Sequence, residues 1–282
     1  MIDPAAILLN LLLFAAGASI GSFVNVVAYR LPRGLSLVRP RSFCPACGAP
    51  IQAWNNIPLL SFAILRARCG KCAARIPLRY PISELGLGLI ALYLAWNFSP
   101  LDAFARFTLC AALFAVSWID FDWRLIPDVI TLPGIAVGVG AAALVMPDVG
   151  LASSLWGVAV GGGFPLAVAE GYARIRGREG LGMGDVKLMA MIGAFLGWQA
   201  VLFTALGGSL VGIAAGLSAG LRQRRIPAGA APQPAPAEET DPARANEAPG
   251  LLQTAVPFAP CLSLAAAIFA LFQPRLLNWF AG

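Results

Sequence analysis

The sequence predicts an all-α integral membrane protein of about eight transmembrane helices, with a cytosolic, zinc-ribbon-like loop of four cysteines between the first two. Of the 282 residues, 59% are hydrophobic and only 12% are charged, about half the charge of an ordinary soluble domain. The apolar residues fall in runs of membrane-spanning length. The chain has no histidine, which excludes Ser-His-Asp and Cys-His catalysis and HExxH zinc proteases.

Short polar joints separate eight apolar runs, and each run is predicted to form one span. The first has no basic residue before it, so we interpret it as a retained span and not as a cleaved signal peptide. The sixth is the shortest. The runs are Ala5–Val27, Ile82–Phe98, Ala103–Ile119, Val129–Met146, Leu151–Tyr172, Val186–Leu196, Ala200–Leu221 and Val256–Phe272.

The basic residues predict how the spans are oriented. Nine Lys or Arg residues and no acid lie from Arg30 to Arg79, so the positive-inside rule places this segment in the cytoplasm. Successive spans cross the membrane in opposite directions, which places the loops 120–128 and 174–185 on the cytoplasmic side as well. A cationic loop beside a membrane explains the net charge of +6 better than a nucleic-acid-binding face, so we expect no nucleic-acid partner.

These features divide the chain into five expected parts. Residues 226–249 contain almost no large apolar side chains, a composition typical of a disordered segment. The parts are a first transmembrane helix (1–29), a cytosolic zinc-binding loop (30–80), a transmembrane core (81–221), a disordered cytosolic linker (222–255) and a last transmembrane helix (256–282).

Four cysteines in the basic loop form two CxxC pairs, Cys44-Pro-Ala-Cys47 and Cys69-Gly-Lys-Cys72. Two such pairs can hold one tetrahedral zinc ion, and a site whose four positions are all filled by protein is structural. Two disulfides are the alternative, but the reducing cytoplasm disfavours them. We therefore predict structural Zn²⁺ at Cys44, Cys47, Cys69 and Cys72.

Carboxylates at two predicted membrane edges are the candidate catalysts. Asp120 continues the third apolar run directly, with Asp122 and Asp128 after it, and Asp185 directly precedes the sixth run. Acids are costly at a membrane edge and are functional candidates there, although for Asp128 a helix N-cap after Pro127 is the preferred interpretation.

Asp120 and Asp185 are expected at the same membrane face, which suggests an aspartyl dyad. One ionised carboxylate would take a proton from an attacking water, and its protonated partner would donate to the carbonyl oxygen. The alternating glycines before Asp185 allow an extended backbone that could receive a substrate strand. Candidates for this active-site loop are Gly182, Gly184, Asp122 and Lys187.

Taken together, these motifs resemble the prepilin peptidases, the bifunctional type IV leader peptidases and N-methyltransferases of bacteria. The resemblance covers nearly the whole chain. It implies an aspartic endopeptidase of the GxGD type in the bacterial inner membrane, which cleaves the basic leader from type IV prepilins or pseudopilins at the cytoplasmic face. It puts Asp120 and Asp185 on the catalytic pair. The matching segments are 21–32, the CxxC pairs, 79–84, 119–128 and 182–187.

The resemblance also implies methylation of the new N-terminus, with S-adenosylmethionine as the methyl donor. Glu84 and the CxxC loop fall in the region that the family links to this reaction, although Glu84 could equally be an acid at a helix start. The chain departs from the family at Ala67, where glycine is more common. Asn25, within the first run, is interpreted as a helix–helix hydrogen-bonding residue.

Two alternatives remain open. One is a peptidase without methyltransferase activity. The other is a non-catalytic membrane scaffold or small transporter whose zinc ribbon binds a partner, and it predicts that loss of the cysteines, not of the acid pair, controls function. Membrane lipid is a further expected partner, contacted by the Arg-rich loop.

Overall fold

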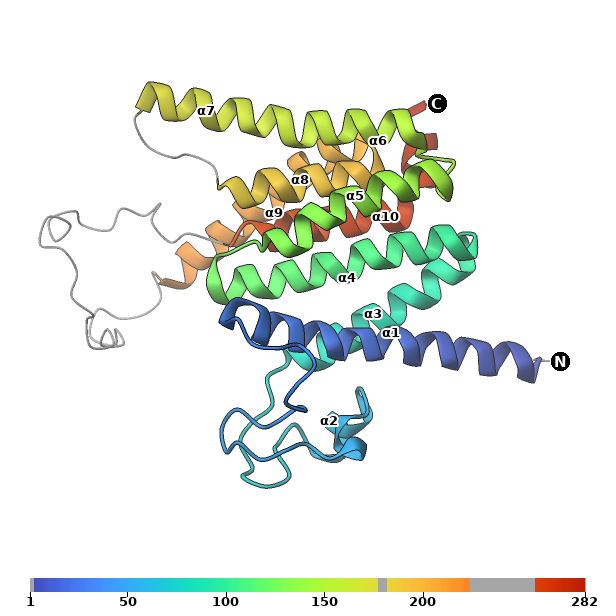
Figure 1. Ribbon diagram of the computed structural model, residues 1–282, viewed down its shortest axis with the longest axis vertical. Helices are drawn as coiled ribbons and strands as arrows, with labels where there is room; N and C mark the ends of the chain where they lie inside the picture. Colours follow the sequence, from blue (N-terminus) through green and yellow to red (C-terminus); the bar gives the residue numbers. More distant parts are fainter. Residues whose placement is uncertain (1–2, 177–181, 224–256, 282) are drawn as a thin grey trace, which may run out of the picture.

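The computed structural model describes residues 3–176, 182–223 and 257–281. This part of the chain is helical and contains no β-strand, only two isolated β-bridges in the Cys-rich loop. The long helices lie side by side with their axes roughly parallel (Figure 1). The predicted all-α class is therefore confirmed.

Each predicted apolar run overlaps helical structure, and the largest difference is at the last run, which is predicted to end at Phe272 whereas the helix continues to Ala281. The fifth run is interrupted by a π-helical turn, η3, and the predicted linker is described only up to Gln223. The helices of the bundle are α1 (Pro4–Arg30), α3 (Arg79–Asn97), α4 (Pro100–Trp123), α5 (Asp128–Leu144), α6 (Gly150–Val158), η3 (Ala159–Gly163), α7 (Phe164–Arg176), α8 (Met183–Leu196), α9 (Trp198–Gln223) and α10 (Ala259–Ala281).

The outer surface of the bundle is suited to lipid. Within the described ranges, five helical segments are long and apolar enough to cross a membrane, namely α1, α4, α6 with α7, α9 and α10. Large apolar side chains such as Leu8, Leu12, Trp156 and Leu206 are exposed along them, which is unfavourable in water over so large an area. The chain is therefore a membrane protein.

The short helix α8 forms the centre of the bundle. It contacts α4, α5, α6, α9 and α10, and every residue from Leu188 to Leu196 is buried, as expected for a helix that is apolar all round. Gly157 of α6 and Gly193 of α8 lie back to back, so that a Cβ on either would overlap the carbonyl of the other. Such close approach at small residues is typical of membrane helices.

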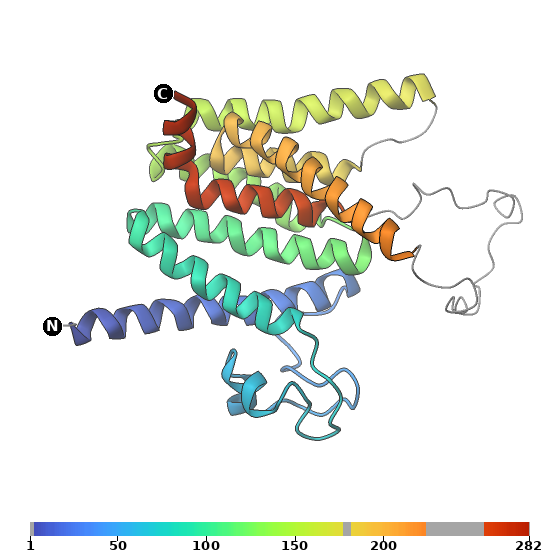
Figure 2. The same ribbon diagram turned by 180° about the vertical axis from the view of Figure 1, so that it is seen from behind.

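The acids and the basic loop belong to the same end of the bundle. The last turn of α4 and the first turns of α5, α8 and α10 lie there, whereas the N-terminus and the α3–α4 turn lie at the opposite end (Figure 1, Figure 2). This arrangement agrees with the alternation predicted from the charges. It places Asp120 and Asp185 at one end of the molecule.

The Cys-rich loop, with its short helices η1 (Leu31–Arg33), η2 (Ala53–Asn56) and α2 (Leu60–Ile64), folds back along the C-terminal half of α1 (Figure 1). The buried Arg30 side chain donates to four carbonyls between Ser36 and Arg41, at 2.8–3.4 Å. These bonds turn the chain back at the end of α1.

Candidate active site

Asp120 lies in the last turn of α4, and only 7% of its surface is exposed. The backbone N–H of Ala259, at the start of α10, donates to its Oδ2 atom at 3.1 Å. The two residues are 139 positions apart, so no local pattern could have indicated this contact. The carboxylate is thus held between two helices.

Asp185 lies in the first turn of α8, half-buried, after the extended residue Gly182. Asp120 in the last turn of α4 and Asp185 in the first turn of α8 lie at the same end of the bundle. The expectation that Gly184 belongs to an extended segment is wrong, because α8 begins at Met183, before the predicted start. Glycine is required there for another reason: a Cβ would lie 2.8 Å from the side chain of Ile126.

The neighbouring charged residues form ion pairs between helices. Arg79 of α3 binds Asp122 at 2.6 Å, and Lys187 of α8 binds both oxygens of Asp128 at 2.7 and 2.8 Å. Asp128 has no side-chain capping bond at the start of α5, so its predicted N-cap role is not seen. These pairs fix the ends of α3, α4, α5 and α8 around the acid pair.

The Cys-rich loop brings its four predicted ligands together. Their sulfur atoms all lie within 4.8 Å of one another, and Sγ of Cys44 lies 3.9 Å from Sγ of Cys72. Sulfurs around a tetrahedral zinc ion with Zn–S bonds of about 2.3 Å lie roughly 3.8 Å apart. The cluster could therefore hold a metal ion, and its donor set suits zinc.

Hydrogen bonds prepare one of these thiols for metal binding. The backbone N–H groups of Cys72 and Lys71 lower the pKa of Cys69 to about 6, which favours the thiolate that a metal requires. The N–H of Ala74 lowers the pKa of Cys72, but the thiol of Cys47, burial and the thiols of Cys69 and Cys44 together outweigh it and raise the pKa to about 11. Clustered thiolates repel one another, and a divalent cation between them removes this repulsion.

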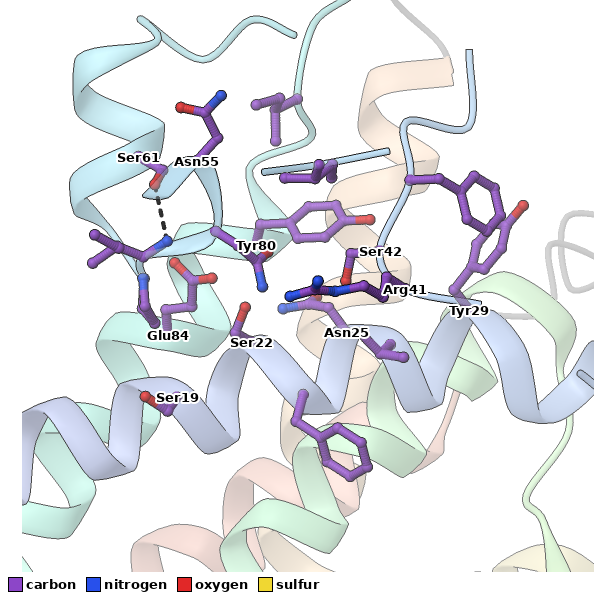
Figure 3. Close-up of a pocket in the computed structure, with 18 of the residues that line it drawn as sticks. Ser19, Ser22, Asn25, Tyr29, Arg41, Ser42, Asn55, Ser61, Tyr80 and Glu84 are labelled. Atoms are coloured by element: carbon purple, nitrogen blue, oxygen red, sulfur yellow. Dashed lines mark hydrogen bonds between the residues drawn. The ribbon is translucent and has the colours of Figure 1, made fainter. Parts of the chain in front are cut away.

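A cavity of about 500 Å³ lies between α1, the start of α3 and the Cys-rich loop (Figure 3). Glu84 of α3 lines it, and one carboxylate oxygen accepts a hydrogen bond from the N–H of Leu59 at 2.7 Å. Glu84 is only 6% exposed. It therefore links the loop to the bundle and is not a solvated acid at the helix start.

Asn25 also lines this cavity, and its predicted role is wrong. Its Nδ2 atom donates to the carbonyl of Gly21 in its own helix at 3.0 Å, instead of bridging to another helix. Its Oδ1 atom is buried and has no hydrogen-bond partner within the described residues.

Two family models match the chain. The bacterial Peptidase A24 N-terminal domain matches residues 15–98, and the type IV leader peptidase family matches residues 107–217. The chain is also similar to curated proteins called prepilin leader peptidase/N-methyltransferase. That of Pseudomonas aeruginosa is 35% identical over 94% of this chain and 90% of its own length, and that of Myxococcus xanthus is 34% identical over the same two shares.

A third relative of the same name, from Stutzerimonas stutzeri, is 38% identical over 76% of this chain and 81% of its own length. The chain belongs to the type IV leader peptidase family. No solved structure matches it. The leader peptidase match contains Asp120 and Asp185, whereas the N-terminal match contains the C-terminal half of α1, all of α3, the four-cysteine cluster and the residues that line the cavity. The two candidate sites therefore fall in different matched regions.

Proposed function

We propose that this protein is a membrane aspartic endopeptidase that removes the leader from type IV prepilins or pseudopilins and then methylates the new N-terminus. The observation that carries the peptidase proposal is that Asp120, in the last turn of α4, and Asp185, in the first turn of α8, lie at the same end of the bundle. Family membership and the names of the relatives support both activities.

The acid pair supplies both proton-transfer groups that peptide hydrolysis needs. Two adjacent carboxyls cannot both ionise cheaply, so the pair retains one proton. The ionised member takes a proton from water as the water attacks the peptide carbonyl. The protonated member donates to the carbonyl oxygen, and a proton is then passed to the leaving amine. The N–H of Ala259 holds Asp120 in place.

The substrate reaches this site from the membrane. A prepilin has an apolar helix behind a basic leader, so it can approach laterally through lipid, with the scissile bond at the bundle end. The extended backbone at Gly182, directly before α8, is a suitable place for a substrate strand. Gly184 and Lys187 of α8 and Asp122 of α4 lie at the same end of the bundle and would border it. The basic loop supports an inner-membrane location with the active site facing the cytoplasm.

The Cys-rich loop serves methylation and the structure of the N-terminal region. Structural Zn²⁺ at the four cysteines would fix the loop against α1, and its arginines would contact anionic lipid. S-adenosylmethionine supplies the methyl group when it is bound.

The decisive experiment is prepilin cleavage by Asp120→Asn and Asp185→Asn variants in membranes. Each should reduce the cleavage rate by at least about 10²–10⁴-fold, because it removes one of the two proton-transfer groups. Asp3→Asn makes the same chemical change at the opposite end of α1, where Asp3 is an exposed N-cap. Asparagine preserves a cap, so this control should cleave like wild type.

Normal processing by either dyad variant would refute the aspartyl mechanism. Mass spectrometry of the mature pilin N-terminus tests methylation independently, since a methyl group adds its mass only when the second activity is present.

A further inference from the structure

The middle of the Cys-rich loop differs in charge from the rest of it. Residues 42–65 contain no charged side chain, whereas Arg39 and Arg41 precede them and Arg66 and Arg68 follow them. An uncharged stretch bounded by cations is typical of a segment that lies in a membrane interface, because the long basic side chains reach the headgroups on either side. The stretch contains the short helices η2 and α2.

These two helices present large apolar side chains on the outside of the molecule. Trp54 of η2 is 68% exposed, and Leu60 and Ile64, one turn apart in α2, are 53% and 69% exposed. Ile57, between the helices, is exposed as well. Water is an unfavourable environment for so many neighbouring apolar side chains. We call the exposed side chains of Trp54, Ile57, Leu60 and Ile64 the apolar face of the loop.

The polar groups beside this face are paired within the chain. The indole Nε1 of Trp54 donates to Oε1 of Gln52 at 3.0 Å, and Oγ of Ser61 donates to the carbonyl of Trp54 at 2.9 Å. The backbone N–H groups of Ile57 and Leu60 also have acceptors, Oγ of Ser61 and the carbonyl of Pro58. Acyl chains offer no hydrogen-bond partner, so a segment in contact with them requires such internal pairing.

The apolar face lies at the depth of the membrane-spanning helices. The N–H of Leu59, directly before α2, donates to Glu84 in the second turn of α3, within the predicted span Ile82–Phe98. On the other side, α2 lines the cavity together with Ser19 and Ser22, which belong to the first predicted span. In both views α2 lies level with the C-terminal half of α1, inside the length of the bundle and not beyond its end (Figure 1, Figure 2).

The surface of α3 at this level is apolar too. Ile82 and Leu85, on either side of Glu84 in sequence, are exposed, as is Leu78 directly before the helix. The loop therefore meets the bundle where the bundle itself faces lipid. A soluble partner has no access at that depth, whereas acyl chains cover an apolar surface there at no cost in hydration.

We propose that residues 53–64 are embedded in the bilayer leaflet at the end of the bundle that carries the acid pair, with the apolar face in contact with acyl chains. This contact is separate from that of the arginines with headgroups, and it depends on neither proposed activity. Helix α2 then forms a wall with lipid on its outer side and the cavity on its inner side.

The test is quenching of Trp54 fluorescence in the full-length protein, reconstituted in phosphatidylcholine vesicles whose acyl chains carry bromine. The contribution of Trp54 is the difference between wild type and Trp54→Phe, a change that keeps an aromatic ring on the surface. This contribution should lose most of its intensity in the brominated vesicles, and iodide in the water should scarcely affect it. Phosphatidylcholine has no net charge, so attraction of arginines to anionic headgroups cannot produce the quenching.

Trp156 provides the matched control. It is 65% exposed, almost as much as Trp54, and it lies on α6 in a helical segment long and apolar enough to cross a membrane. The difference between wild type and Trp156→Phe therefore measures the response of a lipid-facing indole in the same vesicles. Trp54 should respond to both quenchers as Trp156 does.

Three results would overturn the proposal. Quenching of Trp54 by iodide and not by bromine would place the apolar face in water. Protection of Trp54 from both quenchers, with a normal response of Trp156, would mean that a second copy of the chain covers the face. If prepilin reconstituted in the same vesicles removes the quenching of Trp54 by bromine and leaves that of Trp156, the face binds the prepilin helix instead of lipid. None of these results depends on whether the protein cleaves or methylates the prepilin.

Discussion

At the scale of single residues, Arg106 of α4 carries a charge that is buried inside the bundle. Its side chain is fully buried and binds Asp102 at 2.7 Å, Asp148 at 2.6 Å and Oε1 of Gln273 at 2.8 Å. These partners join α4 to the α5–α6 turn and to α10, at the end of the bundle opposite the acid pair. A buried cation of this kind is tolerated only while all its partners remain.

Replacing Arg106 with alanine should lower the free energy of unfolding by about 3–5 kcal/mol, because buried Asp102 loses its counter-charge. Equilibrium unfolding in detergent measures this loss. Arg174→Ala is the control: its bond to Glu170 is exposed, with 76% and 57% of the two side chains accessible, so the expected loss is about 0–1 kcal/mol. Equal losses for the two variants would contradict the prediction.

At the level of structural elements, the two CxxC turns share one backbone conformation at a position that is glycine in the first turn and alanine in the second. The position after the second cysteine has a left-handed backbone in both turns, at Gly48 (φ 69°) and Ala73 (φ 57°). The N–H of Cys44 donates to Ala49 in the first turn, and the N–H of Cys69 donates to Ala74 in the second. Of these two residues, alanine has a steric cost in the left-handed conformation because of its Cβ, and glycine has none.

Ala73→Gly should therefore stabilise the metal-bound loop by about 1 kcal/mol, and Gly48→Ala should destabilise it by a similar amount. A Cβ at Gly48 would meet nothing within 4 Å, so the second effect comes from the backbone alone. Competition with a chelator measures both as changes in zinc affinity. Changes of the same sign in the two variants would refute this explanation.

The same physics explains the departure from the family at Ala67. Its backbone is also left-handed, with φ 58°, and its N–H donates to the carbonyl of Phe62 at 2.9 Å. Glycine, which the resemblance implies at this position, would adopt that conformation without the Cβ penalty. Alanine keeps the turn at a cost in stability.

At the scale of the whole molecule, the bundle and the Cys-rich loop are each stabilised by a different kind of interaction. The bundle has its own apolar core around α8, whereas residues 31–78 contain only short helical turns. Small metal-binding loops of this type take their folding free energy from the metal. The loop should therefore respond to metal loss while the bundle does not.

Lowering the pH tests this difference. The folded pKa of Cys69, about 6, lies below its ordinary value of 9.0, so the stability it contributes is present at high pH and lost as the pH falls through about 6. Because protons compete with the metal for the thiolates, acidification should release the bound metal while the far-UV circular dichroism of the helices remains. Metal retained well below pH 6, or helicity lost together with it, would contradict the prediction.

Prediction from the sequence succeeded where the signal is local. The helices follow from apolar runs, and the four-cysteine cluster follows from two short spacings, since each depends on neighbouring residues. The prediction was wrong at Gly184 because the requirement for glycine there arises from Ile126, a residue distant in sequence. It was wrong at Asn25 because a side chain in an apolar run can bond within its own helix as well as between helices.

The sequence by itself determined the membrane class, the helices, the four clustered cysteines and the two candidate acids. These depend on hydropathy, charge bias and short motifs, which require no knowledge of packing. Only the tertiary structure decided that Ala259 binds Asp120, that Lys187 binds Asp128 and that Asn25 faces a cavity without a partner among the described residues. Such contacts join residues up to 139 positions apart, and helix packing alone brings them together.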